Sequence, residues 1–195
     1  NNDDILIYDN SDLKSSCRLW FSLLYFGHDE KKIHILNGGL KKWIFENKPI
    51  TKLTTEIIES NYVANEKENL VVSFDQIKKN ILSKSFNVID ARSLERFEGK
   101  VSEPRKGLRS GHIQNSFCLP FNQCINQKTG EFKNLEELRE LFNQNENIEK
   151  RLDQVFTCGS GVTAAVLAYA YKMVNNDYIP KIYDGSWSEY GKYPA

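Results

Sequence analysis

The chain has 195 residues, of which 40% are hydrophobic and 27% are charged, a composition typical of globular proteins rather than of disordered or fibrous ones. Its 26 basic and 26 acidic residues give a formal net charge of zero, which argues against a dedicated binder of nucleic acids or of anionic membranes. The apolar runs, such as residues 164–170, are far shorter than the roughly 20 residues that span a bilayer, and the opening Asn-Asn-Asp-Asp predicts no signal peptide.

The elements expected in the first 50 residues come in the order strand, helix, strand and turn. Residues 5–9 form an apolar run that ends at Asp9, residues 19–26 form an apolar helical stretch, and residues 33–36 form a short strand before Asn37-Gly38-Gly39. Residues 51–70 are rich in Thr, Glu and Asn, and we interpret them as a polar linker.

The remainder of the chain also alternates strands and helices. The predicted elements are a helix at 74–82, a strand at 87–90, a helix at 135–142, a strand at 154–158, a turn at 159–161, a helix at 162–173, a strand at 181–183 and a closing segment at 184–190. This alternation predicts an α/β fold in which helices cover both faces of a parallel sheet.

The two ends of the chain share one order of elements, with Asp9 in the place of Cys158 and Gly38 in the place of Gly185. Such similarity predicts an internal repeat. Residues 1–50 are then the C-terminal half of one α/β domain, residues 51–70 a linker, and residues 71–195 a complete second domain. This organisation places the start of the sequence inside a domain.

The chain has four cysteines and three histidines, and neither set has the spacing of metal ligands, so we expect no metal site (Cys17, Cys118, Cys124, Cys158; His28, His34, His112). Scattered cysteines in a chain of this length favour a reducing compartment over a disulfide scaffold. We therefore expect a soluble intracellular protein, and the position of Cys158 distinguishes it from the other three cysteines.

Cys158 lies where a predicted strand passes into a predicted helix, within Cys-Gly-Ser-Gly-Val-Thr-Ala. Ligand sites of α/β sheets lie at the carboxyl ends of strands. Gly159 and Gly161 allow successive backbone N–H groups to turn inward, and the start of the helix adds a positive dipole end, so both favour a thiolate. The alternative is a buried, inert structural cysteine. A cysteine-phosphatase loop is disfavoured because Ala164 stands where such a loop carries an arginine.

Two arginines, Arg96 and Arg105, stand in the loop that follows the predicted strand at 87–90. Guanidinium groups bind carboxylates through two parallel hydrogen bonds, so this pair suits recognition of a small carboxylate or oxyanion. The charge pattern alone favours surface arginines that pair with nearby glutamates. Asp90 and Arg92, which flank the end of that strand, are expected to form structural hydrogen bonds rather than to take part in chemistry.

Together these segments resemble the rhodanese-like sulfurtransferases, most closely the two-domain 3-mercaptopyruvate sulfurtransferases. The resemblance rests on the loop 158–164, on Asp90-Ala91-Arg92 with Arg96-Phe97, on Glu-Pro-Arg ending at Arg105, on Gly111-His112-Ile113, and on Tyr-Asp-Gly-Ser-Trp at 183–187. It extends over nearly the whole chain, with residues 1–50 similar to the end of the family's inactive first domain.

The resemblance implies roles for individual residues. Cys158 is the sulfur-accepting nucleophile, and Ser160 matches a loop serine proposed to assist proton transfer. Arg96 and Arg105 hold the substrate carboxylate and carbonyl, while the rest of the loop contributes its backbone to binding (Gly159, Gly161, Val162, Thr163).

The implied reaction moves sulfur from 3-mercaptopyruvate to a thiol such as thioredoxin, or to cyanide, through a cysteine persulfide and without a cofactor or metal. Neither a nucleic acid nor a membrane is an expected partner. The expected compartment is cytoplasmic, with the mitochondrion as the alternative. Two other functions stay open: a thiosulfate sulfurtransferase, disfavoured by the uncharged loop, and a non-catalytic rhodanese-like interaction module.

Overall fold

A computed structural model of the chain describes residues 3–56, 59, 61–144, 146 and 148–194. Residues 57, 58 and 60 of the predicted linker lie outside the described residues. The linker residues that are described, from 51 to 69, are exposed. Near residue 65 the linker meets the end of helix α1 (Ser16–Tyr25), because Asn65 and Lys67 donate backbone hydrogen bonds to the carbonyls of Phe26 and Tyr25.

The larger sheet has four parallel strands in the order β4 (Ser116–Cys118), β3 (Phe86–Asp90), β5 (Asp153–Thr157), β6 (Lys181–Ile182). The parallel pairing that the alternation of strands and helices predicts is confirmed in each neighbouring pair. Register places Val88 beside Val155 and Ile89 beside Phe156. Successive residues of a strand face opposite sides of the sheet, so the two central strands, β3 and β5, each contribute apolar side chains to two separate cores.

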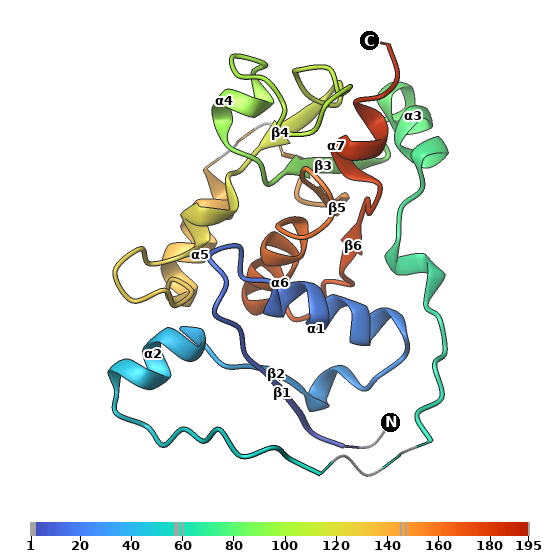
Figure 1. Cartoon of the computed structure of the whole chain (residues 1–195). Coiled ribbons are helices and arrows are strands. Elements are labelled where there is room, and N and C mark those ends of the chain that lie inside the picture. The colour runs from blue at the N-terminus through green and yellow to red at the C-terminus, as the bar shows by residue number, and fades with distance from the viewer. Residues whose placement is uncertain (1–2, 57–58, 60, 145, 147, 195) are drawn as a thin grey trace.

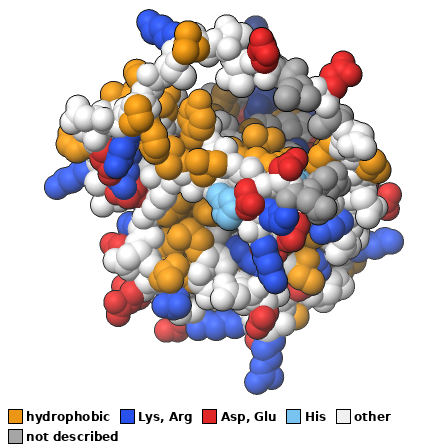
Figure 2. Space-filling view, turned by 90° about the horizontal axis from the view of Figure 1, so that it is seen from below, with side chains coloured by type: hydrophobic (Ala, Val, Ile, Leu, Met, Phe, Trp, Pro, Cys, Tyr) orange, Lys and Arg blue, Asp and Glu red, His pale blue; other side chains and the backbone are white. Residues whose placement is uncertain are grey.

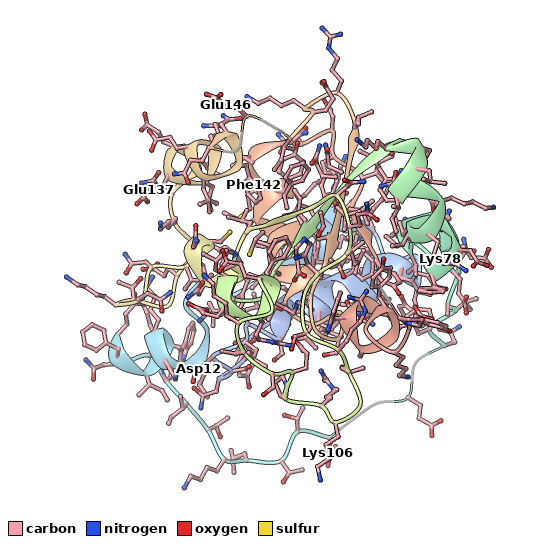
Figure 3. All side chains as sticks on the ribbon, turned by 90° about the horizontal axis from the view of Figure 1, so that it is seen from above. Asp12, Lys78, Lys106, Glu137, Phe142 and Glu146 are labelled. Atoms are coloured by element: carbon pink, nitrogen blue, oxygen red, sulfur yellow. The ribbon has the colours of Figure 1, made fainter. Side chains whose placement is uncertain are left out.

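Helices cover both faces of this sheet, as the fold class predicts. Helices α3 (Phe74–Ser83) and α7 (Ser186–Tyr190) supply Ile77 and Trp187 to the core that contains Val88 and Val155. Helices α5 (Leu135–Asn143) and α6 (Ala164–Val174) cover the opposite face. In Figure 3, Phe142 of α5 lies toward the body of the protein while Glu137 points away from it. The apolar spacing of α5 therefore predicts its buried face.

Helices α3 and α5 begin where their sequences provide a capping box. Ser73 and Gln76 exchange side-chain and backbone hydrogen bonds at the start of α3, and Asn134 and Glu137 do so at the start of α5. The short helix α4 (Leu94–Phe97) and strand β4 were not among the predicted elements. Three short 3-10 helices complete the described structure: η1 (Glu30–Lys32), η2 (Glu68–Leu70) and η3 (Phe121–Cys124).

The first 50 residues form a separate two-stranded parallel sheet, β1 (Ile5–Ile7) with β2 (Ile33–Ile35), together with α1 and α2 (Gly39–Phe45). Helix α1 lies beside α6 (Figure 1), and Trp20 meets the ring of Tyr169 edge-on with the centroids 5.0 Å apart. Buried residues of α1 and α6 belong to one continuous apolar core. The two parts of the chain are therefore joined by packing as well as by the linker.

Beneath this smaller sheet, apolar side chains reach the surface. Figure 2 shows hydrophobic groups gathered on the face seen from below, where β1 and β2 lie in Figure 1. Leu6 and Tyr8 are each 60% exposed, and Phe45 of α2 is 86% exposed. Among the described residues no helix has both the length and the apolar character needed to cross a membrane.

Candidate active site

Cys158 follows directly after β5, and the five residues after it lead into α6. Its Sγ accepts a hydrogen bond from the backbone N–H of Ser160 at 3.4 Å. The Cys158 carbonyl accepts the N–H of Trp187 at 2.9 Å, and the Cys158 N–H donates to the Ser186 hydroxyl at 3.3 Å. Only 2% of Cys158 is exposed. The cysteine is thus fixed at the carboxyl end of a central strand with one loop amide directed at its sulfur.

The two glycines of the loop lie against charged side chains, and Gly161 is required by its conformation. Gly161 has φ +79°, a conformation that L side chains rarely adopt, and a Cβ there would lie 2.9 Å from Arg18 Nη1. A Cβ added at Gly159 would lie 3.1 Å from Arg96 Nη2 and 3.7 Å from Arg105 Nη1. Both guanidinium groups therefore stand beside the cysteine loop, while the substrate-binding roles that the resemblance implies for Arg96 and Arg105 stay predictions.

The other predicted loop residues lie on the same turn. Val162 and Thr163 accept backbone hydrogen bonds from Ala165 and Val166, which begins the first turn of α6. The 11-residue helix α6 begins directly after the cysteine loop, so its N-terminus, which is the positive end of the helix dipole, lies at the loop. The substrate-binding roles of Val162 and Thr163, and the proton-transfer role of Ser160, stay predictions.

A buried network of charges supports the arginines. Arg92 donates from Nε and Nη2 to the Asp90 carboxylate and from Nη1 to Glu103 Oε1 at 2.8 Å, so both Asp90 and Arg92 form structural hydrogen bonds, as expected. Arg96 donates to the same glutamate, from Nε at 3.2 Å and from Nη2 at 2.5 Å. The charge-pattern expectation of a glutamate partner therefore also holds for Arg96.

The remaining cysteines have different environments. Burial raises the pKa of the Cys118 and Cys124 thiols to about 12 and raises the pKa of Cys17 further still. A thiol with so high a pKa is protonated at neutral pH and is a poor nucleophile. Those three cysteines are therefore unsuited to nucleophilic chemistry.

Sequence reasoning assigned no role to three residues that contact the loop. Arg18, at the start of α1, forms an ion pair with Asp184, and its Nη1 lies 3.5 Å from the carbonyl oxygen of Gly161. Ser186 has φ +52° and holds the base of the loop through its hydroxyl. Asp184 and Ser186 belong to the segment 183–187, which contributes to the family resemblance. That resemblance is the only feature of the sequence that could have pointed to a role for them.

Two clefts of about 570 and 550 Å³ lie away from Cys158. The first lies between α2 and the segment from Phe121 to Gly130, and the second lies beside Cys118 and α5. No group of His, Cys, Asp and Glu side chains within the described ranges is arranged to hold a metal ion.

Comparison with known proteins places this geometry in a family. Residues 73–193 match the model of the rhodanese-like domain. A thiosulfate/3-mercaptopyruvate sulfurtransferase of Arabidopsis thaliana is 37% identical over 215 residues, covering all of this chain and 61% of the relative. The 3-mercaptopyruvate sulfurtransferase of Homo sapiens is 36% identical over 95% of this chain and 62% of its own length. The chain thus spans about three-fifths of these relatives.

A solved structure supports the same placement. The crystal structure of SseA from Escherichia coli, which represents the rhodanese fold of 3-mercaptopyruvate sulfotransferases, superimposes on this chain with a TM-score of 0.79 at 32% sequence identity. The match covers 94% of this chain and 66% of SseA. The family model, the fold and the position of the cysteine loop agree, and the chain belongs to the rhodanese-like domain family.

Proposed function

We propose that the chain is a sulfurtransferase that takes sulfur from 3-mercaptopyruvate and passes it to a thiol through a persulfide on Cys158. The observation that supports this most directly is the juxtaposition of the Cys158 loop with Arg96 and Arg105. Such an arrangement joins a candidate nucleophile to two groups that bind carboxylates. Relatives named for this reaction cover the whole of the chain.

The reaction needs a thiolate and one proton. The Cys158 thiolate attacks the thiol sulfur of 3-mercaptopyruvate, an S–S bond forms, and the C–S bond breaks with its electrons passing to the pyruvate enolate. A proton delivered to the enolate carbon, with Ser160 as the proposed assistant, gives pyruvate. The product is the Cys158 persulfide, and an acceptor thiol such as thioredoxin then takes the outer sulfur. Arg96 and Arg105 hold the carboxylate and carbonyl, and no cofactor takes part.

The experiment is release of pyruvate from 3-mercaptopyruvate with an excess of a small thiol as acceptor. The parent chain should turn over, Cys158→Ser should not, and Cys118→Ser should keep the parent rate because its thiol is neither activated nor beside the loop. Equal pyruvate release by parent and Cys158→Ser would refute the proposed nucleophile.

Thiosulfate is the alternative donor, since the Arabidopsis relative is named for both donors. The loop from Gly159 to Thr163 carries no charged side chain, whereas a dianion benefits from a nearby cation. We therefore expect a higher kcat/KM for 3-mercaptopyruvate than for thiosulfate on the same preparation. A higher value for thiosulfate would reverse this preference.

A non-catalytic interaction module is the second candidate, and the 2% exposure of Cys158 is the observation that favours it. The two candidates differ in the alkylation rate of Cys158 as pH is varied. An enzyme thiolate should react well below the reference thiol pKa of about 8.5. A rate that rises only near that value would support the module.

We further infer that residues 1–50 are the C-terminal half of an inactive rhodanese-like domain and that they repeat the end of the second domain (71–195). Backbone hydrogen bonds support this. Leu36 and Leu40 donate to Ile7 and Asp9, just as Tyr183 and Trp187 donate to Phe156 and Cys158. The Asp9 carboxylate accepts the Ser16 N–H at 2.7 Å, in the place where Cys158 Sγ accepts a loop amide.

Separate expression tests this organisation. If the second domain is complete, residues 71–195 should fold alone, although the α6 surface that α1 covers is then exposed. An unfolded fragment would show that residues 71–195 are not a complete domain without residues 1–50. Placement in the cytoplasm or in the mitochondrion stays a prediction from composition.

A further inference from the structure

Glu103 joins two arginines of the site and is not itself placed to touch a substrate. Its side chain is 1% exposed, and it accepts hydrogen bonds from Arg92 Nη1, Arg96 Nε and Arg96 Nη2. Burial of a carboxylate to this extent destabilises the folded state unless charged hydrogen-bond donors surround it. Glu103 meets that condition through two guanidinium groups.

The contact with Glu103 fixes which edge of Arg96 is available. Nε and one N–H of Nη2 are directed at Glu103, so the opposite end of the guanidinium, formed by Nη1 and the second Nη2 N–H, stays open. Arg96 is 25% exposed, and its Nη2 is the atom nearest to a Cβ added at Gly159. Glu103 therefore holds the open end of Arg96 beside the cysteine loop.

The same contacts set the charge of the site. The Asp90 carboxylate balances Arg92, and the Glu103 carboxylate balances Arg96. In the part of the chain that the structure describes, none of the ion pairs includes Arg105. On the loop's other side, Arg18 is balanced by Asp184. Of the four guanidinium groups named here (Arg18, Arg92, Arg96 and Arg105), Arg105 is therefore the one whose charge no carboxylate partner among the described residues balances.

We propose that Glu103 is a positioning residue that also determines donor specificity, by orienting Arg96 and cancelling its charge so that the site favours a singly charged donor over a dianion. This inference rests on the proposed function. A thiolate that attacks a dianion experiences repulsion that one excess positive charge does not offset. A monocarboxylate donor needs one cation and one oriented fork of N–H donors, which Arg105 and Arg96 provide.

The test is the substitution Glu103→Gln, which keeps the size and one of the two acceptor oxygens but removes the charge. The readout is the ratio of Cys158 alkylation rates with iodoacetate, an anion, and iodoacetamide, its neutral analogue. We expect a several-fold rise in that ratio, together with a shift of relative kcat/KM from 3-mercaptopyruvate toward thiosulfate. An unchanged or lower ratio would overturn the inference, because a purely structural role would slow both reagents alike.

Glu95→Gln is the matched control, since Glu95 lies in the neighbouring helix α4, is exposed, and its carboxylate pairs with Ser93 and the helix backbone. It should leave the ratio at the parent value. If Glu103→Gln fails to fold, Glu103→Asp serves instead. That variant keeps the charge and should keep the reagent ratio while lowering kcat/KM for 3-mercaptopyruvate, and a raised ratio would contradict the charge argument.

The alkylation ratio separates this inference from the proposed function. A chain that transfers no sulfur but shows the predicted rise in Glu103→Gln would refute the enzyme and keep the electrostatic role of Glu103. A chain that transfers sulfur with an unchanged ratio and donor preference would keep the enzyme and refute that role. If Cys158 reacts with neither reagent, both proposals fail, because the thiol is then inaccessible.

Discussion

Arg105 differs from the other guanidinium groups at the site in being exposed and outside the buried charge network. Its Nη1 nevertheless lies near Gly159, on the side of the loop that Arg96 also occupies. An exposed arginine near a reactive cysteine can meet the donor without first breaking an ion pair. We therefore propose that Arg105 attracts the donor carboxylate directly.

Replacing Arg105 by Met is predicted to raise the KM for 3-mercaptopyruvate about tenfold or more, because one hydrogen bond to a charged group is worth about 1.5–3 kcal/mol. Arg105→Lys should recover part of the loss, since it restores the charge without the planar fork. Lys106 lies at the outer turn of the same loop (Figure 3), and Lys106→Met is the matched control. Equal KM values for all three variants and the parent would exclude a donor-binding role for Arg105.

At the scale of single elements, α1 is attached to the cysteine loop of the other part of the chain. Arg18 pairs with Asp184 after β6 and lies within reach of the Gly161 carbonyl. The pair is partly exposed, with 33% and 42% of the two side chains accessible. Ion pairs of this exposure contribute little to stability, typically about 0–1 kcal/mol. The Arg18–Asp184 pair should therefore affect the geometry of the cysteine loop rather than the stability of the fold.

The substitution Arg18→Met is predicted to lower sulfur transfer several-fold while the free energy of unfolding changes by less than about 1 kcal/mol. The physical reason is that the Gly161 turn loses the side chain that joins it to α1. Kinetics together with urea denaturation would measure both quantities, with the exposed Lys31→Met as control. Unchanged kinetics would show that the loop keeps its geometry without α1.

At the scale of the whole molecule, the core shared by α1 and α6 couples the first 50 residues to the rest. Trp20 is 2% exposed and packs on Tyr169. Its replacement by Ala should cost about 3–5 kcal/mol, whereas Leu82→Ala, at an 89% exposed position, should cost little. Urea denaturation should show one transition that Trp20→Ala shifts as a whole. Two transitions, of which only one shifts, would contradict a common core.

Sequence patterns predicted the helices and strands whose hydrophobic residues follow a regular spacing over a short stretch of the chain. The strands that end at Asp90 and before Cys158 are clear as apolar runs, and α3 and α5 show helical spacing. Strand β4 was missed because Ser-Phe-Cys lacks the apolar run that marks the equally short β1, and helix α4 was missed because four residues are too few to display a helical period. Predicted ends differ from observed ones by a few residues, as for α6, which begins at Ala164 rather than at 162.

Contacts between distant segments were beyond the reach of the sequence alone. Charge pattern suggested a glutamate partner for Arg96, but not that Glu103 is buried between Arg96 and Arg92. Similarly, nothing in the order of residues shows that Arg18 reaches Gly161, which is 143 positions away. Family resemblance implied that Arg96 and Arg105 bind the substrate, which stays a prediction, and the structure places both guanidinium groups near Gly159 of the cysteine loop.

The central claim is that Cys158 accepts and carries a sulfur atom. Intact-mass measurement after incubation with 3-mercaptopyruvate tests it most directly, with mapping of the modified peptide. We predict that the parent chain gains the mass of one sulfur atom at Cys158, that excess thiol removes it, and that Cys158→Ser gains none. A gain of sulfur by Cys158→Ser, or a parent chain that stays unmodified, would contradict this claim.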